Sequence, residues 1–197
     1  MNTPKTLTTT ESNQLIYFLH KSNGSAQEIK KAARNTCIAL LMLDAGLRVG
    51  EVARLRRSSL VTLTEAVLQI WIPAKITKTK TERIVPTTER LRISIDELRG
   101  YCWTEDLYAG DRYAFVGEDP LKHISVRQIE RIIAFGGMCA FGRSVHPHIL
   151  RHTFASRLMR ITNSRIVQQL LGHKSLNSTQ IYTHPNGDDL INAIKKI

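Results

Sequence analysis

The sequence predicts a mainly α-helical domain that carries one small antiparallel β-sheet, an α+β fold. Apolar residues recur at helical spacing in most segments, which indicates helices that each bury one face. Two short β-rich segments, residues 66–72 and 83–86, are joined by a polar run that turns the chain. The 197 residues, 42% of them apolar, are enough for one packed domain.

The first half of the chain contains three predicted helices around this pair of strands. Thr8 and Glu11 have the spacing of a capping box, which starts a helix that runs to about Lys21. A longer helix follows, and Gly46 fits its C-terminal cap. After the two strands, residues 88–100 are expected to form the third helix.

The second half is expected to be mostly helical. Residues 113–116 suggest a short strand, and helices are predicted over 125–140, 148–160, 164–171 and 188–197. In the helix from 148, an apolar stripe is expected at Leu150, Phe154, Leu158 and Ile161, with His148, Arg151 and His152 on the adjoining face. In the next helix the expected buried set is Ile166, Val167, Leu170 and Leu171, and Gly172 ends the helix.

The charge of the chain favours a polyanionic partner. Lysine and arginine outnumber aspartate and glutamate by 28 to 17, which gives a formal charge of +11. Each cation placed on a phosphate releases a condensed counterion, so nucleic acid is the expected partner class. No apolar run of membrane-spanning length and no apolar signal core occur, so we expect a cytoplasmic protein with no membrane partner. The three cysteines are widely spaced and predict neither a disulfide framework nor a zinc site.

Four motifs follow one another along the chain. They are DAGLRVGEVARL at 44–55, HILRH at 148–152, LLGH at 170–173 and TQIYTH at 179–184. In this order they resemble the boxes of the tyrosine recombinase (phage integrase) catalytic domain, and the resemblance covers nearly the whole chain, residues 7–196. Each box alone is a weak signal, whereas the four together are specific.

The resemblance implies an enzyme that cuts and rejoins DNA strands. Tyr182 would attack a DNA phosphodiester and form a 3′-phosphotyrosine with a free 5′-hydroxyl, in integration, excision or inversion of a mobile element. Arg48 and Arg151 would hold phosphate oxygens. Guanidinium groups would take the place of a metal ion, so no cofactor and no metal site are expected.

The remaining roles also follow from the resemblance. His148 would act as general base, His173 would hold a non-bridging oxygen, and Glu51 would orient the cluster from behind. The family's catalytic lysine lies in a β-hairpin before a proline, and Lys78 matches it, eight residues before Pro86. Lys75 and Lys80 lie in the same turn and remain alternatives for the proton donor.

Three other interpretations stay open at this point. His146, His148 and His152 could bind zinc, although no carboxylate or cysteine stands near them. A type IB topoisomerase, which relaxes supercoils without site preference, would use a similar set of residues. A non-catalytic DNA-binding regulator would also be basic and helical, but it would not need the arginines, histidines and tyrosine together.

The motifs also suggest a domain organisation. We expect a catalytic domain over residues 1–187 and a C-terminal helix over 188–197, which either packs on its own core or exchanges between protomers. The first arginine box begins near residue 44, so we expect no N-terminal core-binding domain, as in the short recombinases that invert fimbrial switches. The resemblance implies double-stranded DNA, a homo-oligomer (a tetramer on DNA) and accessory DNA-bending proteins as partners. It also implies a nucleoid-associated protein of bacterial or phage origin.

Overall fold

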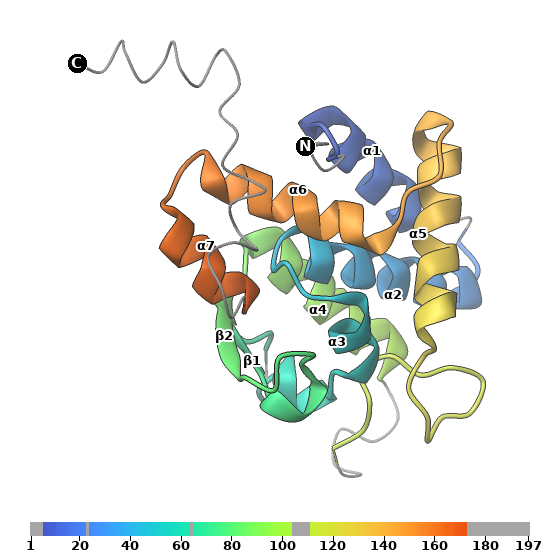
Figure 1. The fold of residues 1–197 in the computed structure, drawn as a ribbon. Helices are drawn as coiled ribbons and strands as arrows, with labels where there is room; N and C mark the ends of the chain where they lie inside the picture. The colour runs from blue at the N-terminus through green and yellow to red at the C-terminus, as the bar shows by residue number, and fades with distance from the viewer. Residues whose placement is uncertain (1–5, 23, 64, 104–110, 173–197) are drawn as a thin grey trace.

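Helices make up most of the structure. The computed structural model describes residues 6–22, 24–63, 65–103 and 111–172 (Figure 1). In chain order the elements are α1 (Thr9–His20), α2 (Ala26–Leu43), α3 (Val49–Arg54), η1 (Arg57–Ser59), β1 (Gln69–Ile72), η2 (Ala74–Ile76), β2 (Arg83–Pro86), α4 (Glu89–Cys102), α5 (Val126–Phe141), α6 (Pro147–Met159) and α7 (Ser164–Leu171). The predicted fold class, mainly α with a small antiparallel sheet, is confirmed.

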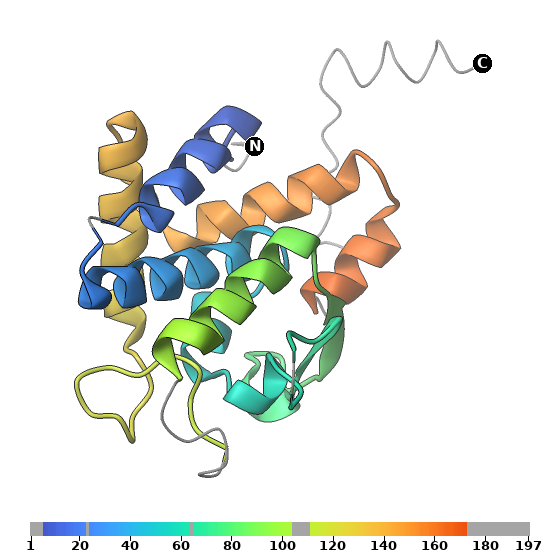
Figure 2. The same cartoon turned by 180° about the vertical axis from the view of Figure 1, so that it is seen from behind.

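Helix α2 forms the centre of the core. Every residue from Thr36 to Leu43 is buried. A helix that is apolar all round has to be covered on every side, and α1, α4 and α6 all pack against it. Figures 1 and 2 show α6 and α4 on opposite sides of α2. The C-terminal end of this fixed helix leads directly into the segment that contains Arg48.

The two strands form a hairpin that turns one face to the core. Ile70 pairs with Val85 and both are buried, whereas the neighbouring pair Trp71 and Ile84 faces outward. This alternation is the period of two that a sheet imposes. Strand β1 begins at Gln69, later than predicted, because Ala66 pairs with Val61 in an isolated bridge instead.

Helices α6 and α7 share a second, smaller apolar cluster. Its buried members are Phe154, Ala155, Val167 and Leu171. Two predicted members are wrong: Ile161 lies beyond the end of α6 and is exposed, and Ile166 on α7 is nearly half exposed. Gly172 ends α7 as predicted, with a left-handed φ of 62°.

Several other boundaries compare directly with prediction. The capping box of Thr8 and Glu11 starts α1, as expected. Helix α2 is capped by Asp44, so Gly46 lies two residues beyond the cap and takes a φ of +63° there. Residues 113–116 form no strand but only isolated bridges, from Tyr113 to Arg56 and from Val116 to His123. The predicted helix over 188–197 lies outside the described residues.

None of the helices in the described part of the chain is both long and apolar enough to cross a membrane.

Candidate active site

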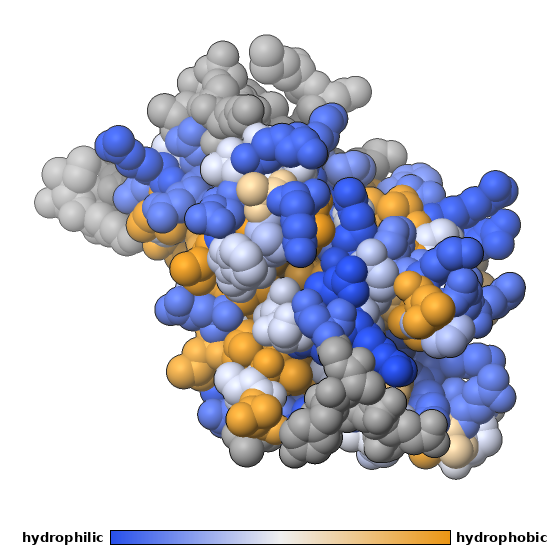
Figure 3. Space-filling view, turned by 90° about the horizontal axis from the view of Figure 1, so that it is seen from below, coloured by the Kyte–Doolittle hydropathy of each residue, from blue (hydrophilic) through white to orange (hydrophobic). Residues whose placement is uncertain are grey.

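A cleft of about 500 Å³ opens where α3, the turn of the β-hairpin and the start of α6 meet. Its lining contains residues from three distant parts of the sequence: Arg48, Val49, Gly50, Glu51, Arg54, Lys75, Ile76, Thr77, Lys78, Lys80 and His148. The cleft therefore brings together four of the predicted site residues, and both alternative lysines. The face toward which the hairpin turn points carries a broad band of hydrophilic side chains (Figure 3).

Arg48 is held at the start of α3 by Glu51. The backbone N–H of Arg48 donates to Oε2 of Glu51 at 2.8 Å, which caps the helix, and Nη1 of Arg48 lies 3.2 Å from Oε1. The same Nη1 is 3.4 Å from the carbonyl oxygen of Leu171. The Arg48 side chain is still 20% exposed and lines the cleft, so its guanidinium is both anchored and accessible.

Glu51 is a buried carboxylate whose main partner is Arg83, a residue of β2. Nη1 of Arg83 donates to Oε1 at 3.0 Å and Nη2 donates to Oε2 at 2.7 Å, a two-pronged ion pair. Burial alone would raise the pKa of Glu51. The hydrogen bonds and charge of Arg83, the backbone N–H of Arg48 and the charge of Arg151 outweigh it and hold the pKa below its ordinary value. Glu51 therefore stays ionised in this setting.

Arg151 points into the protein rather than toward an exposed face. It is 4% exposed, its Nη2 donates to the carbonyl of Leu171 at 2.8 Å, and its Nη1 donates to the carbonyl of Gly46. These two backbone carbonyls draw the guanidinium inward, so Arg151 lies behind the cleft and is not part of its lining. A side chain at Gly46 would collide with the ring of Phe154, so the close approach of this loop to α6 requires glycine.

The C-terminal end of α7 receives three arginines. The last carbonyls of a helix have no partner within the helix and carry the negative end of its dipole. The Leu170 carbonyl accepts Nε of Arg83 at 2.9 Å, and the Leu171 carbonyl accepts from Arg48 and Arg151. The end of α7 is thereby fixed against the cleft. His173 and Tyr182, the other two predicted catalytic residues, lie outside the described residues.

His148 is exposed at the second residue of α6 and lines the cleft. Its ring centroid is 6.2 Å from that of His152, one helical turn further on. Burial lowers the pKa of His152, and the nearby charges of His148 and Arg151 lower it further. Among the described residues, no group of three or more histidine, cysteine, aspartate and glutamate side chains is placed to hold a metal ion.

The hairpin turn carries Lys75, Lys78 and Lys80, and all three are exposed and line the cleft. Thr77 organises the turn: its Oγ1 accepts the N–H of Thr81 at 3.1 Å and lies 3.1 Å from the carbonyl of the same residue. The geometry does not single out one lysine, so the assignment of the proton donor to Lys78 stays a prediction.

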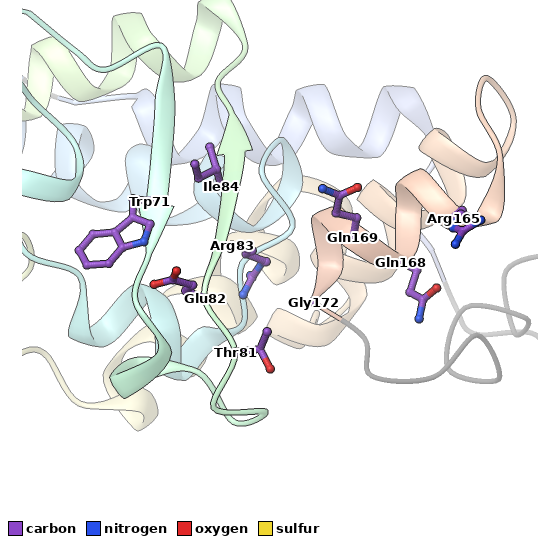
Figure 4. Close-up of a pocket in the computed structure, with 9 residues that line it drawn as sticks. All are labelled: Trp71, Thr81, Glu82, Arg83, Ile84, Arg165, Gln168, Gln169 and Gly172. Carbon is purple, nitrogen blue, oxygen red and sulfur yellow. The ribbon is translucent and has the colours of Figure 1, made fainter.

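Sequence reasoning missed Arg83. A signal was present, because Arg83 has the same parity as Val85 and so falls on the buried face of β2. A charged residue at an inward strand position requires a buried partner, and Glu51 is the carboxylate that supplies it. On the outer side, Arg83 borders a second cleft of about 580 Å³ between the hairpin and α7 (Figure 4).

Comparison with known proteins gives consistent matches. The phage integrase family model matches residues 5–188. A tyrosine recombinase of Pseudothermotoga lettingae is 32% identical over 168 residues, which cover 85% of this chain and 55% of the relative. Tyrosine recombinase XerC of Thermodesulfovibrio yellowstonii is 31% identical over 201 residues, which cover 98% of this chain and 62% of the relative. The chain thus spans little more than half of the first relative and about three-fifths of the second.

Solved structures show the same fold. The crystal structure of XerA recombinase superposes with a TM-score of 0.78 at 30% identity, over 100% of this chain and 66% of that one. XerH site-specific recombinase, in a pre-cleavage complex with its difH substrate, gives 0.75 at 23% identity, over 98% and 54%. With the motifs in order and the family match over most of its length, this chain belongs to the phage integrase family, the tyrosine recombinases.

Proposed function

We propose that this protein is a site-specific recombinase that cleaves and rejoins DNA strands through a 3′-phosphotyrosine intermediate. One observation carries the proposal: Arg48, Glu51, the lysine-bearing turn and His148 come from separate parts of the sequence and line a single cleft. Family membership supports the same chemistry. The partner is double-stranded DNA, which suits a chain with a formal charge of +11.

The nucleophile in this proposal is Tyr182. A free tyrosine has a pKa near 10, so roughly one in a thousand is ionised at pH 7 and a base has to remove the proton during attack. His148, exposed at the rim of the cleft, is the proposed base. The new bond joins the tyrosyl oxygen to phosphorus, and the bond from phosphorus to the 5′ oxygen breaks. Lys78 supplies the proton that this leaving oxygen takes up.

The charge that builds up on phosphorus is stabilised by arginine. Arg48 and Arg151 are proposed to hold non-bridging oxygens. The Arg48 guanidinium already borders the cleft, and a fixed fork needs no reorganisation as charge develops. The Arg151 guanidinium has to give up a contact with the Gly46 or Leu171 carbonyl to reach a phosphate in the cleft. His173 is proposed to donate to one of the same oxygens. Bond energy is kept in the tyrosyl ester, so a second 5′-hydroxyl can rejoin the strand by the reverse reaction.

The test is a covalent-trapping assay. Wild-type protein and Tyr182→Phe are mixed with nicked suicide duplexes selected from a random library, and the products are separated on denaturing gels. A protein–DNA adduct from the wild type alone is expected, and sequencing of the trapped strand identifies the site. DNA binding without an adduct would contradict the proposal and favour a regulator, and relaxation of any supercoiled plasmid would favour a topoisomerase.

Assembly is part of the proposal. We propose that protomers meet as a tetramer on DNA in the bacterial cytoplasm, with residues 188–197 exchanged between neighbours. Removal of these residues is expected to abolish synapsis, measured as paired-duplex complexes on native gels, while the melting temperature of the remainder stays the same. Unfolding of the truncated chain would instead favour packing of this segment on its own core.

A further inference from the structure

Arg83 occupies an unusual position for a strand arginine. Its side chain is 4% exposed and lies on the inner face of β2. The guanidinium binds two parts of the protein at once: both Nη atoms contact the Glu51 carboxylate, and Nε donates to the Leu170 carbonyl at 2.9 Å. Figure 4 shows the side chain between β2 and the end of α7, close to Gly172.

The Glu51 carboxylate is shared unequally between two arginines. Arg83 contacts it through both oxygens, at 3.0 and 2.7 Å, whereas only one side-chain nitrogen of Arg48 reaches it, at 3.2 Å. Arg83 is thus the principal counter-ion. This division leaves the Arg48 side chain bordering the cleft, although it stands next to a buried carboxylate.

We propose that Arg83 is a positioning residue for the phosphate site: it neutralises Glu51 so that the charge of Arg48 remains available to a phosphate in the cleft. The inference rests on the proposed function for its catalytic consequence. Arg48, Arg83 and Arg151 contribute three positive charges and Glu51 one negative charge, so the cluster carries a net charge of two. That matches the doubly negative phosphorane of a phosphodiester attacked by an oxyanion. Without Arg83 the cluster would keep one net charge, and Glu51 would pair with Arg48 alone.

The close approach of Gly172 to Arg83 independently supports a fixed position for the Arg83 side chain. A Cβ at Gly172 would lie 3.1 Å from Cδ of Arg83 and 3.4 Å from its Nη1. Glycine at the end of α7 therefore suits both its left-handed φ of 62° and the Arg83 side chain beside it, which would have to shift to make room for a Cβ.

The test compares variants that separate charge from shape. Arg83→Met removes the charge and the fork, Arg83→Lys keeps the charge and loses the fork, and the double variant Glu51→Gln with Arg83→Met removes both charges together. Arg90→Met is the matched control, because Arg90 forms a similar two-pronged pair with the buried Asp44 away from the cleft. Circular-dichroism melts establish which variants are folded at the assay temperature.

Two readouts are measured on each folded variant. The first is the single-turnover rate of adduct formation on a trapped suicide duplex, with the half-saturating DNA concentration determined separately. The second is the affinity of the cleft for inorganic phosphate, followed by NMR through the side-chain Nε–H signal of Arg48. The second readout does not depend on strand cleavage.

The expected pattern is specific to neutralisation of Glu51. Arg83→Met should cleave about 50-fold more slowly with little change in half-saturating DNA concentration, as for loss of one preorganised charge in a transition state. Arg83→Lys should stay within about fivefold of wild type, and the double variant should recover about tenfold over Arg83→Met, because the surplus negative charge is gone. Phosphate affinity should follow the same order, and Arg90→Met should match wild type.

Other outcomes overturn the inference. The first is a folded Arg83→Met variant that matches Arg90→Met in both cleavage rate and phosphate affinity. The second is a double variant that cleaves more slowly than Arg83→Met, which would indicate a merely structural role for the Arg83–Glu51 pair. If Arg83→Met does not fold, a folded Arg83→Lys that loses about 100-fold in cleavage would also contradict neutralisation. If wild type forms no adduct, the proposed function fails. The phosphate titration then decides for Arg83 alone. The inference requires Arg83→Met to bind phosphate most weakly, with Arg83→Lys and the double variant between it and wild type.

Discussion

Two walls of the same cleft are built in opposite ways. One wall contains Arg48 and Glu51, which belong to an arginine junction completed behind the cleft by Arg83, Arg151 and the carbonyls at the end of α7. This junction is almost entirely buried, and both oxygens of its carboxylate are hydrogen-bonded. The opposite wall is the lysine turn, residues 75–80, whose three ammonium groups are exposed and have no ion pair among the described residues.

The difference corresponds to two chemical tasks. Groups that stabilise developing charge work best when they are fixed before the reaction, because no reorganisation is then needed. A proton donor has to approach a leaving atom whose position changes, and a long side chain on a turn can do so. Mutations in the junction should therefore affect folding and cleavage together, whereas those in the turn should affect cleavage alone.

The largest effect is expected from Glu51→Ala. This change leaves the buried Arg83 without its partner, and removing one member of a buried ion pair destabilises a protein by about 3–5 kcal/mol. The free energy of unfolding is measured by urea denaturation. Glu82→Ala, which removes the exposed carboxylate next to Arg83, serves as control and should stay within about 0.5 kcal/mol of wild type. A loss under about 1 kcal/mol from Glu51→Ala would show that the junction is not structural.

Lys78→Ala tests the other wall. Loss of a general acid should slow cleavage by about 10²–10⁴-fold, while stability changes by less than about 0.5 kcal/mol. A substrate with sulfur in place of the 5′-bridging oxygen should restore the rate, because a thiolate leaves without a proton. Lys75→Ala and Lys80→Ala are the matched controls. If the sulfur substrate rescues one of them instead of Lys78→Ala, the proton donor is that lysine.

Gly172→Ala measures how tightly the end of α7 packs against Arg83 of β2. The left-handed φ alone should cost about 1–2 kcal/mol in unfolding free energy. Gly142 is a suitable control, because its φ is +74° and a Cβ there meets nothing within 4 Å. Gly142→Ala should show the φ penalty alone, and Gly172→Ala should lose more and also cleave more slowly, because its Cβ displaces Arg83. Equal losses in both variants would indicate that the close approach has no energetic weight.

The smallest effect concerns acid pH. The pKa of Glu51 lies below its ordinary value of 4.5, so folding favours the ionised form and the stabilisation is fully present above pH 4.5. This stabilisation is lost as the pH falls from 4.5 through the lowered pKa of Glu51 in the folded protein. The difference in unfolding free energy between wild type and Glu51→Gln should therefore narrow below pH 4.5. A difference that stays constant down to pH 3 would contradict the assignment.

Elements with strong local signals were predictable from the sequence. Thr8 and Gly172 cap the helices α1 and α7 where their patterns indicated. The start of β1 was predicted too early because Ala66, Val67 and Leu68 have the composition of a strand. In the structure Ala66 forms an isolated bridge with Val61, and the pairing of β1 with β2 begins only at Gln69. Ile161 and Ile166 fit their helical patterns but are exposed. Helix α6 ends before Ile161, and α7 lies at the edge of the core, where Ile166 is only partly covered.

The site was partly predictable for a different reason. Motif positions identified Arg48, Glu51, Lys78 and His148, and all four line one cleft. The hydrogen-bond partners of Arg151 were not predictable, because the carbonyls of Gly46 and Leu171 are far away in sequence. Arg83 was missed because its role arises only when β2, α3 and α7 meet.

The short helix α7 has a consequence for local opening of the chain. Eight residues are too few for a helix that is stable alone, and only Val167 and Leu171 are buried on it. Part of its stability therefore comes from the arginines at its end. Arg48 serves both as a contact of Leu171 and as a wall of the cleft, so an anion that draws Arg48 away must weaken the hold on α7. By thermodynamic reciprocity, release of α7 increases the affinity of the cleft for the anion. The hydrogen-exchange rates of the backbone amides of α7 should therefore report whether the cleft is occupied.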